Sequence, residues 1–145
     1  MSAVDVLEER LTTEEGERIL AYDDATGRIV KAPVGNLSWG RGFNLMQCGS
    51  SGLFAVMEHY LLTALDTDLL DFEWYTSAGD IRASVPLDMS YNLGLHKFLG
   101  GFPRMIAAMM DDDWAEASKQ CAVKEPDINA SRYAPLRQIL LTGEV

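Results

Sequence analysis

Cysteine is scarce in this sequence, with only Cys48 and Cys121 among 145 residues. Two cysteines are too few for a disulfide framework, so we expect both to be free, buried thiols. Long apolar runs are also missing. The longest, residues 105–110, has six residues, whereas a membrane-spanning helix needs about 20. The first residues contain no basic segment followed by an apolar one, so we expect neither a membrane anchor nor a signal peptide.

Basic residues are few as well: 12 Lys and Arg stand against 22 Asp and Glu, which gives a net charge of −10. No block of Lys or Arg interrupts this acidic composition, so we do not expect nucleic acid as a partner. His59 and His96 have no partner at a metal-ligand spacing, and CxxC and HExxH motifs are absent. We therefore expect neither a metal ion nor another cofactor.

The N-terminal half begins with a helix and continues with short, glycine-rich stretches. Ser2 and Asp5 have the spacing of a capping box, and Val4, Leu7 and Leu11 recur at helical spacing while residues 8–10 face away. Gly16 predicts the end of this helix, just after Glu15. From residue 18 to 43 short apolar stretches alternate with Gly and Pro, which predicts a small antiparallel sheet of three strands.

The second half predicts five to seven helices. One should run from Ser51 to about Leu70. A second begins at the Ser77–Asp80 capping box and is either kinked at Pro86 or begins there. Later starts are expected at Pro103 and Asp113, and a last helix at 131–141. We predict an α+β fold in one domain, 1–145, with a β-containing lobe at about 12–50 and a helical lobe at 51–145 that includes the N-terminal helix.

Two acidic residues, Glu15 and Asp24, are separated by nine residues across the predicted helix end and a strand. In a chain with 22 acids such pairs also arise by chance. However, a carboxylate in the last turn of a helix meets the negative end of the helix dipole, which disfavours ionisation, as a general acid requires. The spacing alone leaves solvated surface charge as the simpler interpretation.

The order of several motifs resembles the T-even phage lysozyme family (glycoside hydrolase family 24) from about Leu7 to Gly143. In that family a Glu-Gly pair is followed by Tyr-x-Asp and a glycine, then by a glycine-rich strand, a helix ending in Asn-x-Gly, two further helices, an arginine and a closing Thr-Gly. The matching residues here are Glu15-Gly16, Tyr22-Asp23-Asp24, Gly27, Ser38-Trp39-Gly40-Arg41-Gly42, Asn92-Leu93-Gly94, Gly101-Phe102, Trp114-Ala115-Glu116-Ala117, Arg132 and Thr142-Gly143.

The resemblance implies a lysozyme-like, mainly helical fold with a small antiparallel β-sheet in the N-terminal lobe. It also implies a muramidase, an endolysin that cleaves the β-1,4 bond between N-acetylmuramic acid and N-acetylglucosamine in bacterial peptidoglycan. Glu15 would be the general acid, and Asp24 and Ser38 would position the attacking water, as in an inverting glycosidase. Gly42, Asn92 and Arg132 would contact the glycan. Such an enzyme is expected to be a monomer in the host cytoplasm that acts on the periplasm or cell wall after release by a separate factor.

Three departures from the family pattern leave alternatives open. Ser38 stands where the family has threonine, Phe43 stands where many members have histidine or arginine, and the stretch between Asp24 and Ser38 is longer than in the shortest members. Asp23 adjoins Asp24, and only the family spacing favours Asp24. Two other interpretations keep the fold: a catalytically silent binding or virion structural module, and a lytic transglycosylase.

Overall fold

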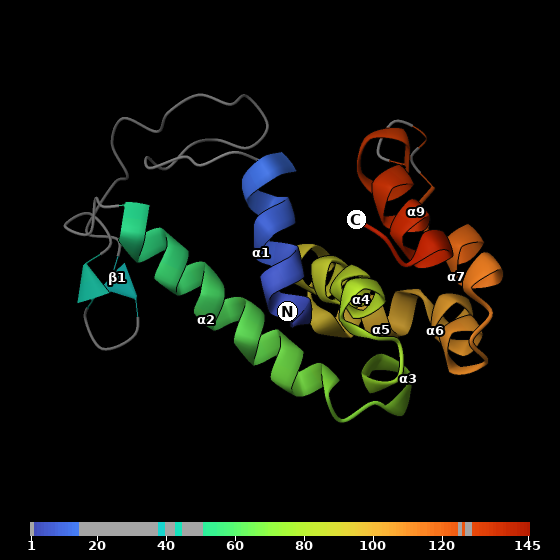
Figure 1. Ribbon diagram of the computed structural model, residues 1–145. Helices are drawn as coiled ribbons and strands as arrows, with labels where there is room; N and C mark the ends of the chain where they lie inside the picture. The colour runs from blue at the N-terminus through green and yellow to red at the C-terminus, as the bar shows by residue number, and fades with distance from the viewer. Residues whose placement is uncertain (1, 15–37, 40–42, 45–50, 125, 127–128) are drawn as a thin grey trace.

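The computed structural model describes residues 2–14, 38–39, 43–44, 51–124, 126 and 129–145. Figure 1 shows a body of helices with a short strand pair at one side. In chain order the elements are α1 (Ala3–Glu14), β1 (Ser38–Trp39), β2 (Phe43–Asn44), α2 (Ser51–Leu69), α3 (Glu73–Thr76), α4 (Asp80–Leu93), α5 (Leu95–Gly101), α6 (Pro103–Met110), α7 (Trp114–Gln120), η2 (Asn129–Tyr133) and α9 (Ala134–Thr142).

The predicted α+β class is wrong for the part of the chain that the structure describes, which is mainly helical. In place of a three-stranded sheet it contains only two two-residue segments, paired antiparallel with Ser38 opposite Asn44 and Trp39 opposite Phe43. Stable sheets need three or more strands with a common hydrophobic face, and the short stretches between glycines at 18–43 offer little such surface. The lobe boundary near residue 50 stays a prediction.

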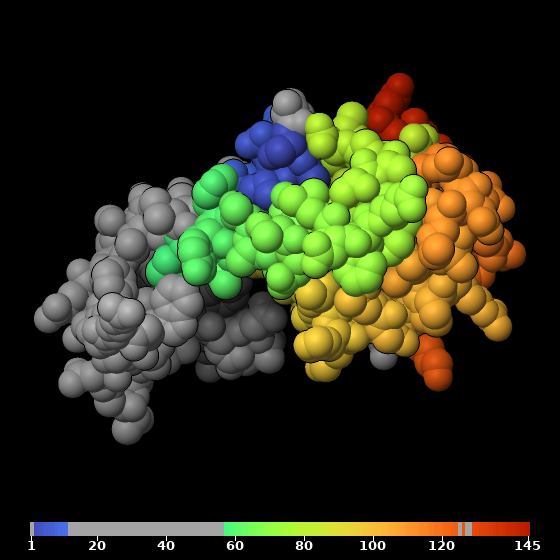
Figure 2. Space-filling model, turned by 90° about the horizontal axis from the view of Figure 1, so that it is seen from below, coloured from blue at the N-terminus to red at the C-terminus, as the bar shows by residue number. Residues whose placement is uncertain are grey.

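The first helix begins where its capping box predicts. Asp5 N–H donates to Ser2 Oγ at 3.2 Å, and Ser2 N–H donates to Asp5 Oδ2 at 2.7 Å. Val4, Leu7 and Leu11 are buried, as their spacing predicts. The helix lies against α2 and α4, and Figures 1 and 2 both show it alongside α2.

The second predicted capping box, at 77–80, is wrong. Ser77 is the C-cap of α3, and α4 begins after Gly79, whose φ of 75° is strained for other residues. Helix α4 then continues through Pro86 to Leu93, so it does not begin at the proline. Ser77 thus ends α3 and does not begin α4.

Helix α4 is the centre of the core. All residues from Ala83 to Ser90 are buried, because α1, α2, α5 and α9 pack around this helix (Figure 1). A helix that is buried on all sides has no need of an amphipathic pattern. The largest fully buried side chains of the core include Leu87 and Met89 of α4 itself and, from other elements, Leu7, Leu62, Leu69, Phe98, Met105, Met109, Leu136 and Leu140. No helix in the described part of the chain is both long and apolar enough to cross a membrane.

The C-terminus of α9 is closed by an arginine from α4. Arg82 Nε donates to the Leu140 carbonyl at 2.9 Å, and its guanidinium carbon lies 4.5 Å from the ring centroid of Trp114. Gly143, with φ of 72°, follows the helix, and a Cβ on it would lie 3.0 Å from that guanidinium carbon. The glycine therefore allows both the left-handed turn and the arginine cap.

We expect Gly143→Ala to lower the free energy of unfolding by about 1–2 kcal/mol, because a left-handed backbone is unfavourable for residues with a Cβ. The added methyl group would also displace Arg82 from the Leu140 carbonyl. Urea denaturation measures the loss. Gly100→Ala is the control, since a Cβ there meets nothing within 4 Å, and alanine in helix α5 should keep or raise stability. Equal stability of Gly143→Ala and wild type would contradict the arginine cap.

Candidate active site

Four of the six predicted site residues are placed only in part or not at all. Glu15, Asp24 and Gly42 lie outside the described residues, and so does Asp23. Ser38 is the first residue of β1, but its side chain is not described. Helix α1 is described as far as Glu14, the residue before the predicted general acid. The distances among the three predicted catalytic groups therefore stay untested.

The other two predicted residues, Asn92 and Arg132, meet on one carboxylate. Asp88 Oδ1 accepts a hydrogen bond from Arg132 Nη2 at 2.9 Å and another from Asn92 Nδ2 at 2.5 Å. Asn92 Nδ2 also donates to the Asp88 carbonyl at 2.9 Å, one turn back along α4. Two residues that the sequence predicts as binding residues, 40 positions apart, thus share one partner.

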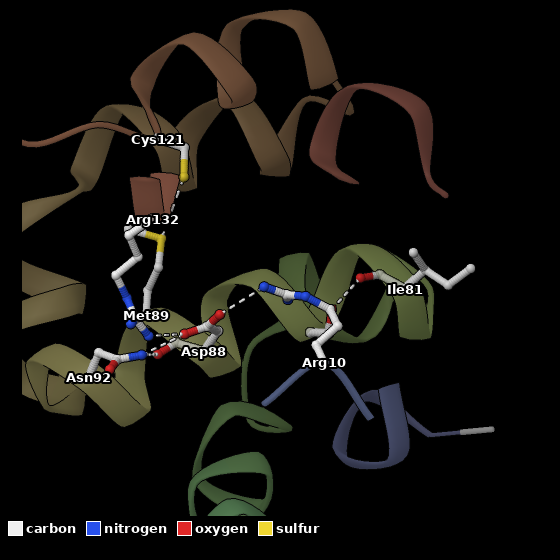
Figure 3. Close-up of polar contacts among 8 residues, drawn as sticks. Arg10, Ile81, Asp88, Met89, Asn92, Cys121 and Arg132 are labelled. Carbon is white, nitrogen blue, oxygen red and sulfur yellow. Dashed lines mark hydrogen bonds and ion pairs between the residues drawn. The ribbon is translucent and has the colours of Figure 1, made fainter. Parts of the chain in front are cut away.

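A second arginine reaches the same carboxylate from the opposite side, as Figure 3 shows. Arg10 Nη2, on α1, donates to Asp88 Oδ2 at 3.0 Å. The side chains of Arg10 and Asp88 are only 4% and 2% exposed, whereas that of Arg132 is 33% exposed. We call Arg10, Asp88, Asn92 and Arg132 the Asp88 cluster. It joins α1, α4 and η2, which are far apart in the sequence.

The expectation that Arg10 faces away from the core was wrong. Arg10 follows the buried residues Val6 and Leu7 by four and three positions, so it lies on the buried side of α1. Helical spacing alone therefore predicts that Arg10 is buried, and only its charge suggested an exposed position. The spacing also gives a signal for Asp88. It stands one turn before Asn92 in the motif Asp88-Met-Ser-Tyr-Asn92, so it lies on the same face of the helix as this predicted site residue.

Electrostatics explain how a charge is tolerated this deep in the core. A buried carboxylate is costly unless it is paired and hydrogen-bonded. Asp88 has a charged or amide donor on each oxygen, and charge-assisted bonds of this kind are stronger than neutral ones. Since its oxygens are engaged by Arg10, Arg132 and Asn92, Asp88 is suited to orient guanidinium groups, not to react with a substrate.

Arg132 lies in a π-helical turn, η2, directly before α9. The side chain of Asn129 anchors the start of this turn: its Oδ1 accepts from Val123 N–H at 2.8 Å, and its Nδ2 donates to the Val123 carbonyl. Turns of this wider type are rare and often mark functional sites. The turn is thus held at its start by Asn129 and at Arg132 by Asp88.

Cys121 lies next to this region, with its Sγ 3.8 Å from Met89 Sδ (Figure 3). Burial raises the pKa of its thiol to about 12, so the thiolate needed by a nucleophile or metal ligand is scarce near neutral pH. Cys121 is a free buried thiol, as predicted; Cys48 lies outside the described residues. Among the residues that the structure describes, no group of three or more His, Cys, Asp or Glu is arranged to hold a metal ion.

Comparisons with protein-family models, with curated proteins and with solved structures gave no match to this chain. Any assignment of function therefore depends on the motifs in the sequence and on the geometry of the Asp88 cluster.

Proposed function

We propose that this protein is a peptidoglycan muramidase of the lysozyme type. One observation carries the proposal: Asn92 and Arg132, which the motif order selects independently, share Asp88 as a partner. The third partner, Arg10, lies on α1 one turn before Glu14, and Glu15 comes next in the sequence. The two predicted binding residues are thus linked to the helix that leads to the proposed acid, which supports an active site assembled from these segments.

In the proposed reaction Glu15 protonates the glycosidic oxygen as the bond to the leaving sugar breaks. Asp24 and Ser38 hold a water on the opposite face of the ring, and this water attacks the anomeric carbon. Two short polar side chains suit a bound water better than a covalent intermediate, so the product has inverted configuration. Gly42 allows the glycan to approach the backbone closely. The substrate is the peptidoglycan of the periplasm or cell wall, reached after release by a separate factor.

Release of new reducing ends from purified peptidoglycan tests this proposal. A muramidase produces reducing N-acetylmuramic acid. A lytic transglycosylase produces anhydro-muramic ends without consuming water, and a silent module binds the glycan without releasing either product. Clearing of outer-membrane-permeabilised cells, followed by turbidity, separates either lytic enzyme from a silent module, and the released ends then distinguish the two enzymes. Absence of reducing ends from a folded wild-type protein would overturn the proposal.

The net charge of −10 predicts an unusual response to salt. Peptidoglycan is anionic, so enzyme and substrate repel one another at low ionic strength. The Debye length falls from about 30 Å at 0.01 M to about 10 Å at 0.1 M salt, so activity should rise over this range. The same peptidoglycan with its carboxyl groups amidated keeps the cleaved bond but loses most of its negative charge, so its cleavage should change little over this range. A steady fall in activity on peptidoglycan would instead indicate that a local basic patch governs binding.

A further inference from the structure

We infer that Asp88 is a positioning residue of the proposed active site. Its carboxylate holds the guanidinium of Arg132 in one orientation between α1 and η2. This inference rests on the proposed function for its catalytic consequence. It adds two residues, Asp88 and Arg10, to which the motif comparison gives no role.

Burial decreases across the cluster in one direction. Arg10 and Asp88 are almost fully enclosed, while one third of the Arg132 side chain is exposed. The buried pair is therefore the fixed part, and Arg132 is the member that reaches the surface. Its bond to Asp88 fixes one edge of the guanidinium, and the five donors of this group lie in one plane, so holding that edge also sets the direction in which the exposed part of Arg132 faces.

Three features fix the carboxylate itself. Asp88 belongs to the most buried stretch of α4, where side chains have little freedom to change rotamer. Arg10 holds Oδ2 from the α1 side, and Asn92 holds Oδ1 from within α4. An acceptor fixed in this way restricts the long side chain of Arg132, which would otherwise lose considerable entropy on binding a ligand.

The direct test uses a double-mutant cycle in activity. Asp88→Asn keeps the size of the side chain but removes its charge, and Arg132→Gln removes the cation. Misplacement of a positioning group by about 1 Å can cost about 100-fold in rate, so we expect Asp88→Asn to lower kcat by about 10- to 100-fold. If Asp88 acts through Arg132, the double variant is no slower than Arg132→Gln alone. Multiplied losses in the double variant would overturn the inference.

Asp66→Asn is the matched control. Asp66 lies on α2, which contributes no residue to the cluster, and accepts a hydrogen bond from Tyr75 Oη, so this variant also removes a bonded carboxylate. Its effect on activity should multiply with that of Arg132→Gln, as for independent sites. Assays are run well below the melting temperature of each variant, so that differences in the folded fraction do not affect the measured rates.

A second measurement does not depend on activity or on the folding of any Asp88 variant. The Nε–H relaxation of Arg132 is measured by NMR in the wild-type protein and assigned by its loss in Arg132→Lys. A rigid Nε–H supports the inference, and one as mobile as those of exposed arginines such as Arg104 overturns it. A wild-type protein without glycan cleavage would refute the proposed function, while this measurement would still decide whether Arg132 is held in one orientation.

Discussion

Replacing Glu15 by glutamine should reduce glycan cleavage by about 10²- to 10⁴-fold, the contribution of a positioned general acid. Glutamine has nearly the same size and can still accept and donate hydrogen bonds, but it has no acidic proton to give to the leaving oxygen. The measurement is the initial rate of reducing-end release by purified protein. Circular dichroism and the melting temperature should match those of the wild type, which separates a chemical loss from unfolding.

Glu14→Gln is the natural control, because it makes the same chemical change one residue earlier, at the last described position of α1. It changes the net charge by the same amount, so any general effect of charge on the anionic substrate appears equally in both variants. We expect Glu14→Gln to keep activity close to that of the wild type. Glu15→Gln with more than about a tenth of wild-type activity would exclude Glu15 as the general acid.

Much of the helical part of this fold was predictable because its signals are local. The start of α1 at Ser2, the end of α2 near residue 70, and the starts of α6 at Pro103 and α7 after Asp113 were all predicted and are confirmed. For α7 the mechanism is visible as well: Asp113 Oδ1 accepts from Glu116 N–H at 3.0 Å. Capping residues and proline act on the backbone within a few positions, so the sequence is enough to identify them.

Apart from the capping box at 77–80, where Ser77 ends α3 instead, the errors and omissions concern interactions between distant segments. Gly and Pro spacing at 18–43 indicated a sheet, but strand pairing depends on partners that spacing alone does not identify. Arg10 was placed on the outer face because a charged residue is rarely buried without a partner, and its partner lies 78 residues away. For the candidate site, the motifs selected Asn92 and Arg132 but not the carboxylate between them. The roles of Glu15, Asp24, Ser38 and Gly42 stay predictions.

Replacing Asp88 by leucine should lower the free energy of unfolding by about 3–5 kcal/mol, the usual cost of removing one partner from a buried ion pair. Leucine has the same number of side-chain heavy atoms with the same branching, so it leaves no cavity, and the loss comes mainly from the unpaired charge. Arg10, only 4% exposed, would lose its bond to Oδ2 inside the core, while Arg132 can turn toward solvent. Urea denaturation followed by circular dichroism measures the change. A cost below about 1 kcal/mol would show that Arg10 is readily stabilised without Asp88.

The double variant Arg10→Met/Asp88→Leu should be more stable than Asp88→Leu alone, because it removes the buried cation together with its anion. Apolar replacement of a whole buried ion pair is often neutral or even stabilising, since no charge then has to leave water. If Asp88 serves to position Arg132, this double variant should regain stability without regaining activity, because the acceptor for Arg132 is still missing. Recovery of both would mean that the cluster supports the site only by keeping the protein folded. A double variant as unstable as the sum of the two single variants would instead show that Arg10 and Asp88 stabilise the fold independently of one another.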